Sequence, residues 1–420
     1  MLYYLFEYLH QSGVPGMGAF LYITTRAALA LITSLLIATI IGSKIIDILR
    51  KKQMADAIRP LDIEGQMAKV GTPTMGGIII ILSLIIPVLL FNKLNNIYII
   101  LMLITTLWLG ALGFADDYVK VFKKNKDGIH GKYKLIAQLG LGVLVSIVLL
   151  TSPAVVIKEN AEVMTVENQR WVNYDNVETK STKTTIPFVK NNNLDYANIA
   201  KAIGLKQNSE AFTLIFVTLL FVFIVMAVSN GANLTDGLDG LATGTSAIIG
   251  VALGILAYTS SHIGFASYLN IMFIPGAEEL VIFAAAFIGA TVGFLWYNSY
   301  PAQVFMGDTG SLTIGGIIAV FAIIIRKELL LPILCGVFLV EALSVIIQTT
   351  YFKHTKRKSG EGKRVFKMTP LHHHFQKPAG TVDALIQRPT RPVAEAKITV
   401  RFWLVSILLA VLTIVTLKLR

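Results

Sequence analysis

A chain of 420 residues in which 54% are hydrophobic, with a mean hydropathy of +0.66, is too apolar to be a soluble protein. Its continuous apolar runs reach the roughly 20 residues that a helix needs to cross a bilayer, whereas strands of a membrane barrel would alternate apolar and polar residues. The single cysteine, Cys335, excludes an intrachain disulfide. The net charge of +12 is first a signal of topology in so apolar a chain, rather than of nucleic-acid binding. We therefore expect an all-α, polytopic integral membrane protein.

The apolar runs predict ten membrane-spanning helices. Their ranges are 19–46, 74–91, 97–117, 134–151, 211–229, 238–260, 279–297, 312–326, 330–352 and 399–418. The segments 47–73, 118–134 and 353–401 carry most of the 37 Lys and Arg residues. Cytoplasmic loops carry such an excess, so these segments are expected in the cytoplasm and both termini outside. Segment 152–210 is then a long outer loop, in which the Val- and Thr-rich stretch 161–188 suits a small hairpin without evident chemistry.

The approach to the second span contains Lys69 followed by Gly-Thr-Pro-Thr-Met-Gly-Gly at 71–77. Threonine hydroxyls and exposed amides at a helix start favour anions, and Lys69 adds a positive charge. An ordinary helix start is the alternative, because proline is common in the first turn.

The third span ends in two adjacent acids, Asp116 and Asp117. Neighbouring residues of a helix point about 100° apart, so the two carboxylates are expected to perform different tasks. The alternative is a pair of helix-end acids that are neutralised by Lys120 or Lys123.

A polar stretch at 229–240 interrupts two apolar runs and contains Asn233, Asp236 and Asp239. In a helix, the spacing of three residues would place all three side chains on one face. Unpaired carboxylates are costly at a membrane, which favours a functional role. A connecting turn is the alternative, since Asn, Asp and Gly are typical of turns.

Between the seventh and eighth spans, the stretch 296–311 contains one acid, Asp308, and no Lys or Arg. Phe305 precedes this acid by three residues, and Asn298 lies further upstream. Aromatic residues here suit a membrane-interface belt. An aromatic side chain beside a metal-binding carboxylate also suits stacking on a nucleotide base.

The ninth loop is strongly basic and contains His372, His373 and His374. These histidines suit either a metal-binding surface or a contact with anionic head groups. Their spacing does not support a closed zinc site.

Together, acids, lysines and asparagines at one membrane face favour Mg²⁺ and phosphoryl chemistry, since Mg²⁺ prefers oxygen ligands and commonly bridges substrate phosphates. A site at the membrane edge implies one lipid and one cytosolic substrate. The sequence contains no Walker loop, kinase glycine loop or dinucleotide-binding motif.

The chain resembles the phospho-N-acetylmuramoyl-pentapeptide transferase family, within the superfamily of polyprenyl-phosphate N-acetylhexosamine-1-phosphate transferases. The resemblance covers nearly the whole membrane portion. It rests on GTPTMGG at 71–77, ADD at 115–117, NLTDGLDGLA at 233–242, FMGDTGS at 305–311 and PLHHHF at 370–375.

This resemblance implies transfer of phospho-MurNAc-pentapeptide from UDP-MurNAc-pentapeptide to undecaprenyl phosphate, giving lipid I and UMP, with Mg²⁺ as cofactor. It implies a single catalytic domain over 1–420 in the bacterial inner membrane, with its active-site cleft on the cytoplasmic face. The outer insertion at 152–210 and the basic loop at 353–398 would belong to that domain. No nucleic-acid partner is implied, and homodimerisation is left open.

The resemblance also implies roles for individual residues. Asp308 would bind the metal, Asp116 would act as base toward the lipid phosphate, and Asp117 would be its acidic neighbour. Asp239 would join these catalytic acids. The remaining residues would contact substrate, with Phe305 stacking on uracil: Lys69, Thr74, Lys120, Lys132, Asn233, Asp236, Asn298, Phe305, Gln348, His372, His373 and His374.

The chain departs from the family pattern in three places, none of which touches the acidic motifs. It lacks an Arg-x-Asp-Gly-Pro stretch before the second span, its outer loop is unusually long, and 376–391 replaces a shorter connection. A transferase that uses UDP-GlcNAc is the nearer alternative. An ion-coupled transporter is a more remote alternative. It would have acids near the bilayer midplane and two related halves, whereas the acids of this chain are expected at one face and no repeat is evident.

Overall fold

The computed structural model describes residues 1–52, 69, 71–125, 127–166, 169–188, 193–202 and 209–418. Within these ranges, nine helices are long and apolar enough to cross a membrane, and α3 is a shorter apolar helix. They are α2 (Ile23–Lys51), α3 (Gly77–Phe91), α4 (Ile97–Phe122), α5 (Gly131–Thr151), α7 (Ser209–Thr235), α8 (Leu241–Ser260), α10 (Glu278–Asn298), α11 (Gly307–Ile324), α13 (Gly336–Ser359) and α15 (Glu395–Thr416). These ten helices correspond, in order, to the ten expected spans, so the all-α membrane fold is confirmed.

Shorter elements connect the long helices. The short helices are α1 (Leu2–Gln11), η1 (Met17–Leu21), α6 (Tyr196–Ala202), α9 (Ile263–Leu269), η3 (Glu328–Leu330), α12 (Leu331–Leu334) and α14 (Leu371–Gln376). The strands are β1 (Ile157–Val166), β2 (Gln169–Thr179), β3 (Lys183–Thr185), β4 (Asn193–Asp195), β5 (Arg364–Phe366) and β6 (Ala384–Ile386). Strands β1 and β2 form an antiparallel pair, which is the hairpin expected in the long loop.

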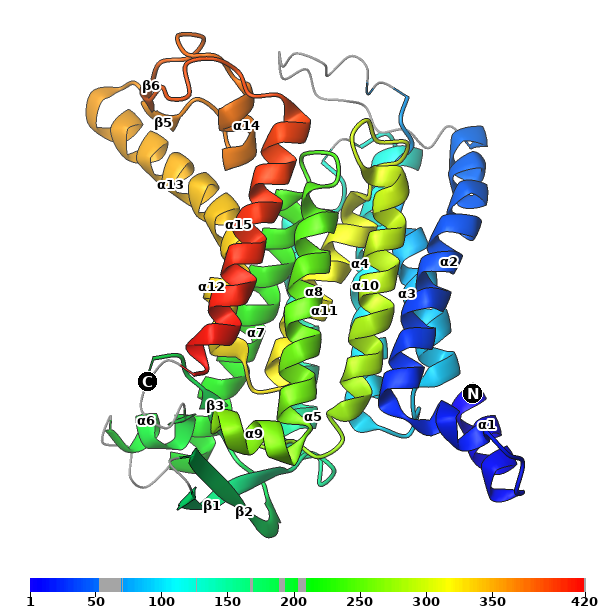
Figure 1. The fold of residues 1–420 in the computed structure, drawn as a ribbon. Coiled ribbons are helices and arrows are strands. Elements are labelled where there is room, and N and C mark those ends of the chain that lie inside the picture. Colours follow the sequence, from blue (N-terminus) through cyan, green and yellow to red (C-terminus); the bar gives the residue numbers. More distant parts are fainter. Residues whose placement is uncertain are drawn as a thin grey trace.

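The two ends of the bundle carry different elements (Figure 1). Both chain termini lie at the end that also carries β1, β2 and α9. The opposite end carries β5, β6 and α14, which belong to the expected basic loop 353–401. Most of the expected loop 47–73 lies outside the described residues.

Helix α11 forms the centre of the bundle, and every residue from Thr309 to Ile324 is buried. A membrane helix that is apolar on all sides suits a position enclosed by other helices. Small residues allow this close packing. A Cβ at Gly77 of α3, for example, would lie 2.1 Å from the backbone nitrogen of Gly310. Helices α3, α4 and α7 all pack on α11, so the residues at its start are held from several sides.

The ninth expected span, 330–352, differs from the structure at both ends. The chain forms the short helix α12, breaks at Cys335, and then continues as α13 to Ser359. Lys356, Arg357 and Lys358 therefore lie in the last turn of a helix that leans away from the bundle (Figure 1), and not in a loop. The length of the apolar run predicted the C-terminal end of this helix too early, because long basic side chains can extend a helix beyond the hydrocarbon region.

Candidate active site

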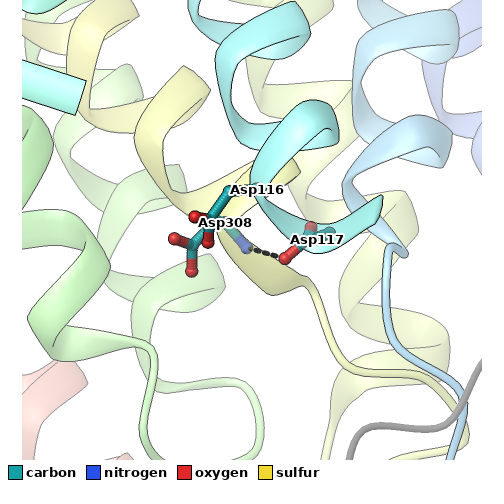
Figure 2. A group of neighbouring side chains, drawn as sticks. All are labelled: Asp116, Asp117 and Asp308. Carbon is teal, nitrogen blue, oxygen red and sulfur yellow. Dashed lines mark hydrogen bonds between the residues drawn. The ribbon is translucent and has the colours of Figure 1, made fainter. Parts of the chain in front are cut away.

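Three carboxylates from two helices gather at one point of the bundle (Figure 2). Asp116 and Asp117 lie in the last turns of α4, and Asp308 lies in the first turn of α11. One oxygen from each of the three residues lies within 4.8 Å of the others. The fold therefore joins two of the motifs that were singled out in the sequence.

Asp117 caps α11 from the neighbouring helix. Its Oδ1 accepts a hydrogen bond from the backbone N–H of Asp308 at 3.0 Å, and its Oδ2 accepts from the N–H of Thr309 at 2.9 Å. The first N–H groups of a helix have no partner within the helix, and a carboxylate there also suits the helix dipole. Gly307 permits the approach, because its φ is 72° and a Cβ would lie 2.5 Å from Asp117 Oδ2. Asp117 thus fixes the position of Asp308.

Asp116 performs a different task. Its Oδ2 lies 2.7 Å from Lys120 Nζ and 2.9 Å from Lys134 Nζ. The same two ammonium groups lie 3.1 Å and 2.6 Å from the oxygens of Asp308. The side chain of Asp116 is 0% exposed, whereas Asp308 is 13% exposed and each lysine 19%. Two acids therefore share two lysines, with Asp116 at the buried side, and the division of tasks between Asp116 and Asp117 agrees with their helical phase.

Lys134, and not Lys132, is the lysine of α5 that reaches the acids. Residues two apart in a helix point about 200° from each other, so only one of them can face the bundle. Lys134 shares its face with the fully buried Gln138, while Lys132 is exposed. Within the described part of the chain, Lys132 forms no ion pair with an acid. The structure therefore brings Lys134, and not Lys132, to the acids.

The polar stretch after α7 is a turn and not a continuous helix. Helix α7 ends at Thr235 and α8 begins at Leu241, so the expected helical stripe of Asn233, Asp236 and Asp239 does not form. The turn nevertheless makes specific polar contacts with distant segments. The Oδ1 of Asp239 lies 2.7 Å from Lys69 Nζ, and its Oδ2 accepts a hydrogen bond from the N–H of Ala302.

The two acids of this turn, Asp239 and Asp236, differ in their surroundings, and Glu395 of another helix contributes to those of Asp239. Glu395, at the start of α15, pairs with Lys69 and accepts a hydrogen bond from the N–H of Asp239 at 2.8 Å. Burial lowers the pKa of Lys69, but Asp239 and Glu395 together outweigh this effect and hold that pKa above its usual value. Burial, and then the negative charge of Asp308, raises the pKa of the half-buried Asp236 to about 8. The carboxyl of Asp236 therefore binds a proton more tightly than an ordinary aspartate does.

The stretch 71–77 docks against the start of α11. The N–H groups of Gly76 and Gly77 donate to the carbonyls of Phe305 and Met306. These two amides are occupied by the chain itself, so they are not among the exposed amides expected to favour an anion, and the helix-start alternative describes them better. Thr74 is buried beside this contact. The pairing holds Phe305 with its half-buried ring centre 5.9 Å from Lys69 Nζ.

Two of the expected substrate-binding amides have protein partners. Asn298 is buried, accepts from the N–H of Gly240 and the hydroxyl of Thr243, and donates to the carbonyl of Val304. The amide oxygen of Gln348 accepts from the N–H groups of Val365 and Phe366 in β5. Both side chains therefore position neighbouring segments.

Asn233 lies closer to the acids. Its amide donates a hydrogen bond to the hydroxyl of Ser311 at 2.9 Å, one turn into α11. It therefore links the end of α7 to the helix that carries Asp308.

The three histidines have three different environments. His374 is buried, with Nδ1 accepting from the N–H of Lys367 and Nε2 beside the carbonyl of Arg388. Burial lowers the pKa of His374. His373 is half-buried, and burial followed by its neighbour His372 lowers its pKa to about 4. His372 is fully buried against Glu341. The run is therefore not an exposed metal-binding surface.

Sequence reasoning missed Lys134, Glu395 and Glu341. Helical phase could have found Lys134, because it lies one turn before Gln138, and a polar residue inside an apolar span marks the face that meets other helices. Glu341 stands inside an apolar run, where a charged residue is itself a functional signal. Glu395 carries no such signal, since an acid in a first helical turn is ordinary.

The arrangement is suited to phosphate chemistry. The donor atoms of the three acids are all carboxylate oxygens, which suit a hard divalent cation. Lys120, Lys134 and Lys69 are partly exposed and offer positive charge to anionic groups.

Comparisons with known proteins identify the family of the chain. The pattern of the family described as Glycosyl transferase family 4 matches residues 99–326. A curated protein of Parabacteroides distasonis is 68% identical, one of Porphyromonas gingivalis 63% and one of Bacteroides fragilis 58%, each over 100% of both chains. All three carry the name phospho-N-acetylmuramoyl-pentapeptide-transferase. On this likeness, the chain belongs to the phospho-N-acetylmuramoyl-pentapeptide-transferase family.

Proposed function

We propose that the protein transfers phospho-MurNAc-pentapeptide from UDP-MurNAc-pentapeptide to undecaprenyl phosphate, releasing UMP and forming lipid I for peptidoglycan synthesis. The observation that carries this proposal is the cluster in which Asp116 and Asp308 share Lys120 and Lys134 at the helix ends of a membrane bundle. In the reaction, an oxygen of the lipid phosphate attacks the β-phosphorus of the nucleotide. The bond to the α-phosphate oxygen breaks, and UMP leaves.

The cluster of Asp116, Asp117 and Asp308 fits Mg²⁺. Asp308 is the proposed ligand because its side chain is more exposed than that of Asp116. The ion would neutralise charge that develops on the diphosphate. Lys120 and Lys134 would bind phosphate oxygens as point charges. Phe305 would stack on the uracil ring, with Lys69 beside it. Asp236, when protonated, would donate a hydrogen bond.

We keep Asp116 as the proposed base toward the lipid phosphate, although its carboxylate would have to act from behind Lys120 and Lys134. A general base contributes about 10²–10⁴-fold. A phosphate monoester loses its second proton near pH ~6, above which the nucleophile needs no base. The activity deficit of Asp116→Asn should therefore shrink as the pH rises past ~6. A deficit that is constant with pH would assign Asp116 to holding the lysines.

The donor decides between the two candidate transferases. Purified protein would be incubated with undecaprenyl phosphate, Mg²⁺ and either UDP-MurNAc-pentapeptide or UDP-GlcNAc. We expect UMP release with the first donor only. Release with UDP-GlcNAc alone would assign the other transferase reaction, and release with neither would refute the proposal.

A further inference from the structure

Glu341 is a carboxylate buried within a membrane helix, and nothing in the proposed reaction uses it. Its side chain is 0% exposed in the second turn of α13. A charge in this position is costly unless it is paired. Its Oε2 accepts a hydrogen bond from the backbone N–H of His372 at 3.4 Å and lies 3.2 Å from Nδ1 of the same residue. Among the described residues, neither ring nitrogen of His372 forms a hydrogen bond, so the side-chain contact is one of proximity. In the described part of the chain, the Oε1 of Glu341 has no hydrogen-bond partner.

The imidazole of His372 extends from Glu341 to the turn between α7 and α8. A Cβ at Gly237 would lie 2.2 Å from Nε2 of His372, so the ring directly supports the backbone of this turn. Gly237 lies between Asp236 and Asp239, and its other side is exposed. The side chain of His372 is 0% exposed, so substrate does not reach it in this conformation.

His372 also supports its neighbour in the sequence. The ring of His373 lies edge-on to it, with centres 4.2 Å apart. A carboxylate packed against one ring nitrogen restrains the orientation of an imidazole, and the backbone N–H of His372 is held by the same carboxylate. Glu341 is therefore placed to fix His372, and through it both the turn that carries Asp236 and the half-buried His373.

We propose that Glu341 is a positioning residue that acts through His372 to hold the Asp236–Gly240 turn in place for the sugar-nucleotide donor. This inference rests on the proposed transferase function. It assigns His372 to support of the site, where the sequence had predicted contact with substrate. Loss of the pair should weaken use of the nucleotide while leaving the lipid acceptor unaffected.

Two substitutions disturb the pair from opposite sides. Glu341→Gln keeps the size of the side chain and removes its charge. Gly237→Ala adds no polar group, and its φ lies outside the left-handed region, so its effect comes from pushing on His372. The matched control is Ser344→Ala, a buried position one turn further along α13 whose hydroxyl donates to the backbone carbonyl of Glu341 and, among the described residues, to no side chain.

The measurement is kcat and KM for each substrate separately, in the full-length protein. Both variants should lower kcat/KM for UDP-MurNAc-pentapeptide by roughly 10–100-fold, as losses of supporting carboxylate–histidine contacts do, without changing KM for undecaprenyl phosphate. Glu341→Asp should recover part of the activity. The double variant should lose little more than either single one, because both act on His372.

The outcomes separate this inference from the function on which it rests. Release of UMP by the parent tests the function, and the variants are judged relative to that rate. Losses that multiply in the double variant, or equal changes in KM for both substrates, would overturn the positioning role. Should Glu341→Gln fail to fold, the same cycle is run with Glu341→Asp and Gly237→Ala, and multiplying losses overturn it equally.

Discussion

Lys134 and Lys132 are two residues apart, yet they lie in different environments. Lys134 pairs with Asp116 and Asp308, whereas Lys132 is exposed. Lys134→Gln should lower kcat/KM by about 10²–10³-fold, the usual effect of removing one charge-stabilising group. Lys132→Gln is the matched control and should stay within a factor of two. The comparison is made by UMP release, and equal losses in the two variants would contradict the assignment.

Substitutions at Asp117 and Asp308 are expected to change different properties, namely stability for Asp117 and turnover for Asp308. Asp117→Asn leaves one acceptor oxygen where the start of α11 uses two, so the free energy of unfolding should fall by about 1 kcal/mol. Asp308→Asn should retain its thermal stability and lose at least ~10²-fold in turnover, whatever the Mg²⁺ concentration. Thermal unfolding in detergent and UMP release are measured for both. The reverse pattern would exchange the two roles.

At the level of elements, the long outer loop has two parts that differ in their contacts with the helix bundle. The hairpin β1–β2 projects at the end of the bundle (Figure 1). Strand β3 and helix α6 instead contact three buried charged residues at the start of η3, which are Arg326, Lys327 and Glu328. The N–H of Thr185 donates to the carbonyl of Arg326, Lys327 donates to the hydroxyl of Thr185, and Tyr196 donates to Glu328 at 2.9 Å.

This division predicts which part of the loop can be removed. Replacing 160–178 with a short Gly/Ser connector should leave turnover within about two-fold, because the acids lie at the other end of α4. Tyr196→Phe should lower the free energy of unfolding by about 1–3 kcal/mol, since it leaves a buried carboxylate oxygen of Glu328 without its donor. A hairpin deletion that inserts and folds normally but loses activity would contradict this division.

Most of the elements could be predicted from the sequence, and the site only in part. Continuous apolar runs define membrane helices well, because length and hydropathy are sufficient for a span. Asp116, Asp117 and Asp308 were each singled out, and the structure brings them together. The partners of each acid could not be predicted, because they depend on helix rotation and on contacts between distant segments. Asp117 bonds a helix start 191 residues away.

At the scale of the whole molecule, the even number of apolar helices among the described residues agrees with both chain ends lying at one end of the bundle (Figure 1). We predict that this end faces outward and that the acids face the cytoplasm, because the basic loop that contains β5, β6 and α14 lies at the opposite end. Cys335 is buried, so an introduced cysteine can be labelled over a low background. In intact cells, an impermeant maleimide should label Ser12→Cys and spare Thr381→Cys, both at exposed positions. The opposite labelling would invert the topology.

The shared lysines have a consequence for biogenesis. Chains are inserted from the N-terminus, so α4 and α5 enter the membrane long before α11 is synthesised. Lys120 stands four residues after Asp116 in the same helix, and the two side chains can pair as soon as α4 forms. Asp308 comes from a stretch, 296–311, that has no basic residue of its own. Its charge is therefore compensated by lysines that were inserted earlier, and the complete cluster can assemble only after the eighth span has entered the bundle.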